Sequence, residues 1–393
     1  MKENNVKIIF HIDMNAFFCS VACILDPSLR GIPFAIGREG TYKGVLSTAS
    51  YEARALGIHS AMPVSDAYHL CKDLKVIHID YSYYEKYHYL FVKLIREYTK
   101  LIEVASIDEV YADMTEASKT KHPLVLAKEI QARLLKEYNL SCSIGIAPTL
   151  FLAKMASDLK KPLGLTVLRK RDVKEILYPL SVKDIYGIGK RTSPTLIQAG
   201  IKTIADFMNE DNKQLIIDLV GLNTYQYVVS HILGKSSNIV DPNRYANSRS
   251  ISTSSTFDVY KTSLSDMEYE LRGMTRYVVS RLKDEQYYAK TVTITLRDSD
   301  FNTITRQKKL EEFSQDFDEI IAIVVELLEN YVDLNKQYRL LGVGLSGLVK
   351  KDKLPKNYDI FTVSDVMKKE IIIDSIIHSF QEKYGENVIK RKK

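Results

Sequence analysis

Residues 105–111, with the sequence Ala-Ser-Ile-Asp-Glu-Val-Tyr, constrain this chain more than any other stretch. Two adjacent carboxylates, Asp108 and Glu109, lie inside an apolar, strand-like run. Burying ionised carboxylates costs free energy unless they are paired or bind a cation. Neighbouring residues of a regular strand point to opposite faces, so both carboxylates converge only where a strand ends or turns. The stretch therefore predicts a hairpin that presents both at its tip, although such a pair taken alone is more often a solvated turn.

A third carboxylate closes a second apolar segment. Residues 7–13 predict a strand buried on both faces, and this strand ends at Asp13. A helix is predicted to follow, with Asn15 as its N-cap. A carboxylate between a buried strand and a helix is a frequent ligand position in α/β folds. The alternative is a helix-start aspartate that backbone amides hold.

A possible anion site follows a strand of small residues at 44–49. Residues 50–57 predict a short helix with Ser50 near its N-cap. Tyr51 and Arg54 are three positions apart, so they share one helix face. A hydroxyl and a guanidinium beside a helix N-terminus favour phosphate binding. An arginine that packs on a tyrosine at the surface explains the same pattern.

The order of predicted elements indicates two folded regions and a helical segment between them. Strands at 7–13, 102–106, 109–114 and 141–146 alternate with helices, which predicts an open sheet with helices on one face and the carboxylates at strand ends. Residues 249–347 read strand, helix, strand, strand, helix, strand, which predicts a small separate domain. A chain of 393 residues is long enough for this organisation.

The positive charge of the chain is concentrated in the helical segment. The formal net charge is +6, and residues 160–249 alone hold 14 Lys and Arg against 8 Asp and Glu. A local basic excess favours a polyanionic partner. The same segment contains Gly187-Ile188-Gly189-Lys190, which predicts a helix-hairpin-helix. Its glycines would let backbone amides approach a phosphate, as in proteins that bind DNA without reading its sequence.

Cysteine usage and hydropathy indicate the compartment. None of the four cysteines forms a Cys-x-x-Cys pair, so neither disulfides nor a zinc site is predicted. The chain shows neither a signal-peptide core nor an apolar run long enough to span a bilayer. We therefore expect a cytoplasmic protein with no membrane partner.

Taken together, these motifs resemble the Y-family (translesion) DNA polymerases, closest to their bacterial DinB and UmuC-like branch. The matching stretches occur in the family's order over residues 7–200: HIDMNAFF at 11–18, STASYEAR at 47–54, ASIDEVY at 105–111, SIGIA at 143–147, LAKMAS at 152–157, KPLG at 161–164 and GIG at 187–189. With the repeat at 249–347, the resemblance covers nearly the whole chain.

The resemblance implies an α+β multi-domain fold shaped like a right hand. Its parts would be a ferredoxin-like palm, small fingers, a helix-hairpin-helix thumb and a β-α-β-β-α-β little finger. Their expected ranges are palm 1–18 and 75–167, fingers 19–74, thumb 168–236, linker 237–248, little finger 249–349 and tail 350–393.

The resemblance also implies a low-fidelity, DNA-directed DNA polymerase that extends a primer across damaged template. Two Mg²⁺ ions would be held by three carboxylates and one backbone carbonyl, those of Asp13, Asp108, Glu109 and Met14. The triphosphate of the incoming dNTP would bind to Thr48, Tyr51, Arg54 and Lys161. Primer-template DNA would contact Gly187, Gly189 and Lys190.

Substrate selection is implied by aromatic and small residues. Phe18 matches the family's steric gate, a ring that leaves no room for a 2′-hydroxyl, and Phe17 is the alternative gate. Val45 and Ser47 would form a small-residue roof over the nascent base pair, which implies weak shape-checking. Asn15 departs from the family, because many relatives have a second aspartate there.

The tail contains a variant of a protein-binding motif. Asn-Tyr-Asp-Ile-Phe at 357–361 resembles the pentapeptide with which bacterial polymerases engage the sliding clamp, with Asn in place of Gln and Tyr in place of Leu. Ile360 and Phe361 would fill a hydrophobic groove of that clamp. Otherwise we expect a monomer.

Two other classes of function fit part of the sequence. A non-catalytic DNA-binding repair scaffold would need the helix-hairpin-helix and the tail, but not three costly carboxylates. A nucleotide cyclase would share the sheet and paired carboxylates, but would need no duplex grip.

Overall fold

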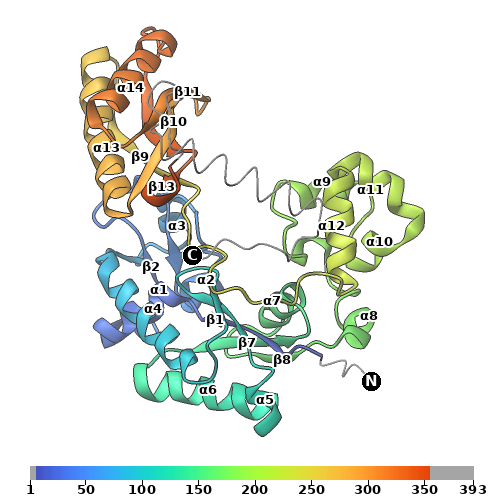
Figure 1. Cartoon of the computed structure of the whole chain (residues 1–393). Coiled ribbons are helices and arrows are strands. Elements are labelled where there is room, and N and C mark those ends of the chain that lie inside the picture. The colour runs from blue at the N-terminus through green and yellow to red at the C-terminus, as the bar shows by residue number, and fades with distance from the viewer. Residues whose placement is uncertain (1–5, 355–393) are drawn as a thin grey trace, which may run out of the picture. The chain divides into compact units, whose positions relative to one another are not determined.

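The computed structural model describes residues 6–354 and divides into two compact units between Asn247 and Ser248 (Figure 1). The first unit contains the predicted palm, fingers and thumb, and the second contains the predicted little finger. The predicted clamp-binding residues Ile360 and Phe361 lie outside the described residues. None of the described helices is long and apolar enough to cross a membrane.

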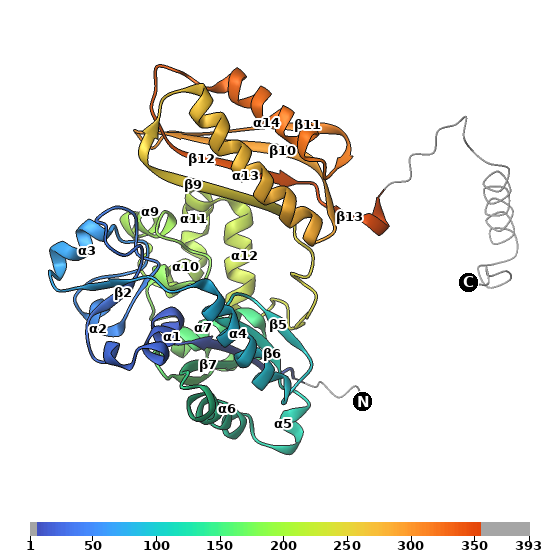
Figure 2. The same ribbon diagram turned by 90° about the vertical axis from the view of Figure 1, so that its left-hand side faces the viewer.

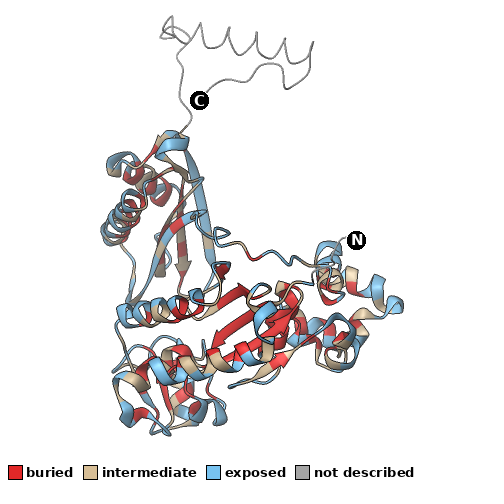
Figure 3. Ribbon diagram, turned by 60° about the horizontal axis from the view of Figure 1, so that its bottom comes forward, coloured by how far each residue is buried: buried red, intermediate tan, exposed pale blue. Residues whose placement is uncertain are grey.

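A five-stranded sheet forms the palm region. Its order is β5-β6-β1-β7-β8, with the strands β1 (Ile9–Met14), β5 (Ile102–Val104), β6 (Glu109–Asp113), β7 (Cys142–Ala147) and β8 (Leu165–Val167). All six residues of β1 are buried, and Figure 3 shows the central strands of this unit in red. The strand expected at 7–13 is therefore confirmed at the centre of the sheet, with antiparallel neighbours on both sides.

Helices cover both faces of this sheet. α4 (Tyr81–Arg96) and α6 (Pro123–Tyr138) share a hydrophobic core with Phe10 and Ile12, whereas α7 (Leu150–Asp158) shares a core with Ile9. The prediction of helices on one face was wrong, because β1 is buried on both faces and each face needs a covering layer. α7 lies so close to β7 that a Cβ added to Gly145 would be 2.1 Å from the carbonyl oxygen of Ala153.

The fingers region has a small sheet of its own. Its order is β3-β2-β4, with β2 (Phe34–Ile36), β3 (Thr48–Ala49) and β4 (Lys75–Ile77). β4 pairs in parallel with β2, so residues 75–77 extend this sheet, although the sequence prediction assigned them to the palm. The helices of this part are α1 (Phe17–Leu25), α2 (Tyr51–Ala55) and α3 (Val64–Leu70). As predicted, Ser50 caps α2 by accepting the N–H of Ala53.

The thumb region is helical. It contains α8 (Val173–Ile176), α9 (Thr192–Gln198), α10 (Ile204–Met208), α11 (Lys213–Val220) and α12 (Leu222–Ile232), and its apolar residues share one core with α7. The first arm of the predicted helix-hairpin-helix is a single 3₁₀ turn at Val182–Asp184 rather than an α-helix. The short helix α5 (Ala117–Thr120) lies in the palm region before α6.

The second unit has the predicted β-α-β-β-α-β order. Its elements are β9 (Ser250–Lys261), α13 (Leu264–Asp284), β10 (Tyr287–Asp298), β11 (Thr303–Ser314), α14 (Phe317–Tyr331) and β12 (Tyr338–Ser346), and β13 (Val349–Lys350) pairs with β10. The sheet order is β11-β10-β12-β9, and Figure 2 shows both helices on one face. Val292, Ile294 and Leu296 pack toward the helices. The opposite face of the sheet, which we term the open face, therefore carries Thr291, Thr293 and Thr295.

Candidate active site

The pairing of β1 with β6 brings the predicted carboxylates to one place. Asp13 lies directly opposite Glu109 in the antiparallel ladder. Asp108 lies in the turn before β6, where its carbonyl oxygen accepts the N–H of Met14 at 2.9 Å. The predicted hairpin tip is confirmed, and Asp13, Met14, Asp108 and Glu109 line one pocket of about 270 Å³. Asp13 and Glu109, which are 96 positions apart in the chain, thus face the same space.

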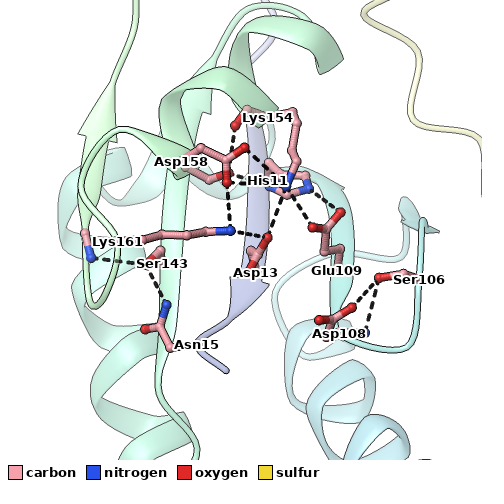
Figure 4. Close-up of polar contacts among 12 residues, drawn as sticks. His11, Asp13, Asn15, Ser106, Asp108, Glu109, Ser143, Lys154, Asp158 and Lys161 are labelled. Carbon is pink, nitrogen blue, oxygen red and sulfur yellow. Dashed lines mark hydrogen bonds and ion pairs between the residues drawn. The ribbon is translucent and has the colours of Figure 1, made fainter. Parts of the chain in front are cut away.

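Two lysines hold the buried carboxylates (Figure 4). The Nζ of Lys154, on α7, lies 3.1 Å from Oδ2 of Asp13 and 2.7 Å from Oε1 of Glu109. The Nζ of Lys161 lies 2.6 Å from the same Oδ2 of Asp13. Sequence reasoning missed the role of Lys154. A signal was present, because a lysine in a helix buried over most of its length needs a carboxylate partner.

The electrostatics of this cluster reflect its burial. Burial, together with a hydrogen bond to Glu109, raises the pKa of Asp13 to about 7, against the opposing charges of Lys154 and Lys161. Burial alone would also raise the pKa of Glu109, but hydrogen bonds from His11 and Asp13 and the charge of Lys154 outweigh it and lower that pKa. The cluster therefore carries negative charge that the protein compensates with ammonium groups.

The third carboxylate is turned away from the other two. Oδ1 of Asp108 accepts a hydrogen bond from Oγ of Ser106 at 2.5 Å, within its own turn (Figure 4). Within residues 6–354, no group of three His, Cys, Asp or Glu side chains is arranged to hold a metal ion. The donor set nevertheless suits Mg²⁺, which prefers carboxylate and carbonyl oxygens, because all four predicted ligands face one pocket.

The predicted phosphate-binding residues line the same pocket: Thr48, Tyr51, Arg54 and Lys161. Arg54 donates from Nε to the carbonyl of Ala49 at 2.9 Å and from Nη2 to Oγ1 of Thr48 at 3.1 Å. Its guanidinium carbon lies 5.1 Å from the ring centre of Tyr51. The packing of the arginine on the tyrosine is therefore confirmed, and both residues line the pocket of the carboxylates; phosphate binding stays a prediction.

The two adjacent phenylalanines have different surroundings. Both line the pocket, but Phe17 is only 3% exposed and belongs to the palm core. Phe18 is half-buried, and its ring centre lies 4.3 Å from that of Tyr84. Phe18 therefore forms a supported wall of the pocket, whereas Phe17 is chiefly a core residue.

The helix-hairpin-helix residues do not line the carboxylate pocket. Gly187 has a φ of 99°, which favours glycine, and a Cβ on Gly189 would meet no atom within 4 Å. Among the described residues, we find no hydrogen-bond partner for the backbone N–H groups of Gly189 and Lys190. The turn thus exposes backbone donors, as its sequence indicated.

Comparisons with known proteins identify the family of this chain. The impB/mucB/samB family model matches residues 12–158, its C-terminal domain matches 248–357, and its helix-hairpin-helix motif matches 170–201. DNA polymerase IV of Oceanobacillus iheyensis is 39% identical over the whole chain and 93% of its own length. DNA polymerase IV 1 of Bacillus subtilis is 38% identical over 98% of this chain and 92% of its own length. This chain belongs to the Y-family of DNA polymerases.

Solved structures support the fold of this Y-family polymerase. A chimeric Y-family DNA polymerase of Dbh has a TM-score of 0.79 and covers 87% of this chain at 24% identity. DinB from Sulfolobus solfataricus has a TM-score of 0.59 over the same share. Each similarity extends over 99% of the solved chain. The right-hand fold implied by the motifs is thereby confirmed, and the protein is a DNA-directed DNA polymerase.

Proposed function

We propose that this polymerase extends a primer on template DNA by two-metal-ion nucleotidyl transfer, with low fidelity and across damaged template. One observation supports this most directly: a single pocket is lined both by the three carboxylates and by the polar and cationic side chains of Thr48, Tyr51, Arg54 and Lys161. The carboxylates suit hard divalent cations, and the cationic residues suit a triphosphate. Both halves of a nucleotidyl-transfer site thus face one space.

The carboxylates and Met14 carry the metal part of the proposal. Asp13, Asp108, Glu109 and the carbonyl oxygen of Met14 would hold two Mg²⁺ ions. When bound, the ions would supply Lewis-acid chemistry: they would lower the pKa of the primer 3′-hydroxyl and neutralise charge on the pyrophosphate. The protein's share is to favour ionised carboxylates: Lys154 opposes the effect of burial on the pKa of Asp13 and helps to lower the pKa of Glu109.

The cationic residues bind and orient the nucleotide in this proposal. Arg54 and Lys161 would contact the β- and γ-phosphates of a dNTP, with Tyr51 and Thr48 as hydroxyl donors. Arg54 is prepared for this role, because two of its nitrogens are already fixed by Ala49 and Thr48. Phe18 would stand beneath the sugar and exclude a 2′-hydroxyl.

DNA binding is proposed for two surfaces, each considered within its own unit. In the thumb, the exposed backbone amides at Gly189 and Lys190 would donate to a phosphate. In the second unit, the open face carries a groove of about 450 Å³ lined with Ser, Thr and Gly, and none of the described residues that line it is acidic. Such donors bind the DNA backbone without reading its sequence.

Low fidelity and clamp binding are the finer parts of the proposal. Val45 and Ser47 are exposed, and Ser47 lines the nucleotide pocket, so small residues border the space for the base pair. A sliding clamp would bind Ile360 and Phe361. Removing residues 355–393 should abolish stimulation by the clamp while leaving distributive synthesis intact; unchanged clamp stimulation would contradict this part.

Primer extension with Mg²⁺ and dNTPs tests the central proposal. Wild type should extend a primer on an undamaged template and also a primer whose next template position is an abasic site. Asp108→Ala should lose extension by about 10³-fold or more, because one shared metal ligand disappears. DNA affinity of the variant, measured by fluorescence anisotropy, should stay within about twofold. DNA binding without extension by the wild type would favour the repair scaffold instead.

A further inference from the structure

Asn15 does not do what its place in the sequence indicates. The predicted N-cap role was wrong: Ala16 is the N-cap of α1, with a left-handed φ of 42° and no side-chain capping bond. The side chain of Asn15 is instead buried, at 2% exposure, and lies beside Ser143 (Figure 4). A buried amide retains such a position only when its polar atoms are satisfied.

The Asn15 amide joins two other segments of the chain. Its Oδ1 accepts the backbone N–H of Leu163 at 2.9 Å, and its Nδ2 donates to Oγ of Ser143 at 2.8 Å. Oγ of Ser143, which is fully buried on β7, also accepts the N–H of Gly164 at 3.2 Å. Asn15 and Ser143 together therefore anchor the turn at 161–164 to the palm sheet.

The turn that Asn15 anchors carries Lys161 into the nucleotide pocket. Leu163 has a positive φ of 62°, a conformation that is unfavourable for a non-glycine residue and that its hydrogen bond to Asn15 supports. The Lys161 side chain is 30% exposed, and its Nζ bonds to Asp13 and Asp158. A triphosphate must draw this ammonium away from those carboxylates. The backbone of the turn therefore has to stay fixed while the side chain moves.

We propose that Asn15 is a positioning residue for the nucleotide: it fixes the 161–164 turn so that Lys161 reaches the dNTP triphosphate. This rests on the proposed role of Lys161 in nucleotide binding. Asn15 does not touch the phosphates in this scheme. Its effect passes through Leu163 to Lys161, and it acts on nucleotide affinity rather than on the chemical step.

A double-mutant cycle on nucleotide binding tests the proposal. Asn15→Ala should raise the dNTP concentration for half-maximal single-turnover rate by about tenfold, with the maximal rate within about threefold. Lys161→Ala should raise it at least as much. The double variant should match Lys161→Ala alone, because Asn15 acts through that lysine. If the double variant instead raised the half-maximal dNTP concentration by the product of the two single effects, the proposal would be overturned.

Three further variants separate positioning from general stability. Asn15→Asp should restore nucleotide affinity to within about threefold, because its carboxylate still accepts the Leu163 N–H and the Ser143 hydroxyl can donate to it. Asn212→Ala removes a comparable amide bridge in the thumb, to the carbonyl of Asp206, and should leave nucleotide affinity unchanged. Ser143→Ala should weaken nucleotide binding less than Asn15→Ala does, since Leu163 keeps its acceptor.

Hydrogen exchange gives a readout independent of catalysis. In the full chain without nucleotide, a peptide spanning 161–165 should exchange faster in Asn15→Ala than in wild type, while β7 keeps its protection. Unchanged exchange, or a lower unfolding temperature without a change in nucleotide affinity, would overturn the proposal. If Lys161→Ala leaves nucleotide affinity unchanged, the proposed triphosphate role of Lys161 fails and takes this one with it. If only Asn15→Ala is silent, the triphosphate role stands alone.

Discussion

The carboxylate pocket and the open face of the second unit present their polar groups in opposite ways. The pocket buries charge: Asp13 is 4% exposed and held by two ammonium groups. The open face carries small hydroxyl side chains and glycines on a regular sheet, with Arg297 and Lys309 among them. A reacting triphosphate requires fixed geometry, which buried networks provide. A sliding duplex requires many weak, sequence-independent contacts, which an exposed sheet face provides.

The largest effect that follows from this contrast is on stability. Lys154→Met should lower the free energy of unfolding of the metal-free protein by about 3 kcal/mol, because two buried carboxylates lose their shared counter-charge. Mg²⁺ at millimolar concentration should recover part of this loss, since a bound cation replaces the ammonium. Urea unfolding with and without Mg²⁺ measures both. A loss below about 0.5 kcal/mol would show that the cluster does not depend on Lys154.

A matched control lies in the second unit. Lys308 forms an ion pair with Glu326 at 2.6 Å, and both side chains are nearly half exposed. Because solvent screens an exposed pair, Lys308→Met should change the free energy of unfolding by less than about 0.5 kcal/mol. Equal losses in the two variants would remove the distinction between the two regions.

The next effect concerns the wall of the pocket. Phe18→Ala should keep DNA synthesis but raise the relative use of ribonucleotides by about a hundredfold, because the clash with the 2′-hydroxyl disappears. Competition between each rNTP and its dNTP in single-nucleotide extension measures the change. Phe17→Leu serves as the control, since Phe17 packs in the palm core and should alter stability more than sugar choice. Unchanged sugar discrimination in Phe18→Ala would exclude Phe18 as the gate.

A smaller effect is expected on the open face. Arg297 lies opposite Thr303, and Lys309 lies opposite Thr291, so both cations share this face. Replacing both by Ala should weaken DNA binding by about tenfold and lower the slope of log affinity against log salt by about two. The maximal extension rate at saturating DNA should not change. Titrations at several salt concentrations measure the slope.

Two other cations of strand β11 provide the control for that experiment. Arg306 and Lys308 lie opposite Ile294 and Val292 and therefore face the helices, where Arg306 stacks on Tyr331 and Lys308 pairs with Glu326. Replacing these two by Ala should leave the salt slope nearly unchanged. If both double replacements lower the salt slope equally, the total positive charge of the hairpin determines DNA binding, and the face on which the charges lie does not.

The sequence predicted the elements and the carboxylates well, and the reason is periodicity. An apolar run stops where a strand ends, so Asp13 and Glu109 could be placed at strand ends of one sheet before their pairing was known. The side of the sheet on which α7 packs was not predicted, because a strand that is buried on both faces does not specify which helix covers which face. Lys154 was missed for the same reason, since its partners are set by that packing.

The polar contacts of the site were beyond the reach of local sequence. Asn15 has the composition of an N-cap, and only tertiary structure shows that its amide bonds to Ser143 and Leu163, more than 120 residues away. Asp108 was expected to point at the metal site, but its hydroxyl neighbour Ser106 competes for the carboxylate. Contacts between distant segments depend on register and rotamer, which a pattern of apolar residues does not encode.

The smallest effect is a pH dependence of the free energy of unfolding, which we expect from Asp113 at the opposite end of β6 from Glu109. Asp113 is buried, which alone would raise its pKa, but hydrogen bonds from Lys7 at 2.6 Å and from Thr115 lower it below its usual range. A carboxyl whose pKa is depressed by folding stabilises the protein above its unfolded pKa of about 4, and this stabilisation is lost as the pH falls through the folded pKa. Asp113→Asn should therefore cost about 1 kcal/mol between pH 5 and 7, and the difference from wild type should shrink below about pH 4. Urea unfolding midpoints of both proteins across this range measure the difference. A difference independent of pH would mean that the hydrogen-bond geometry, and not the charge of Asp113, stabilises this end of the strand.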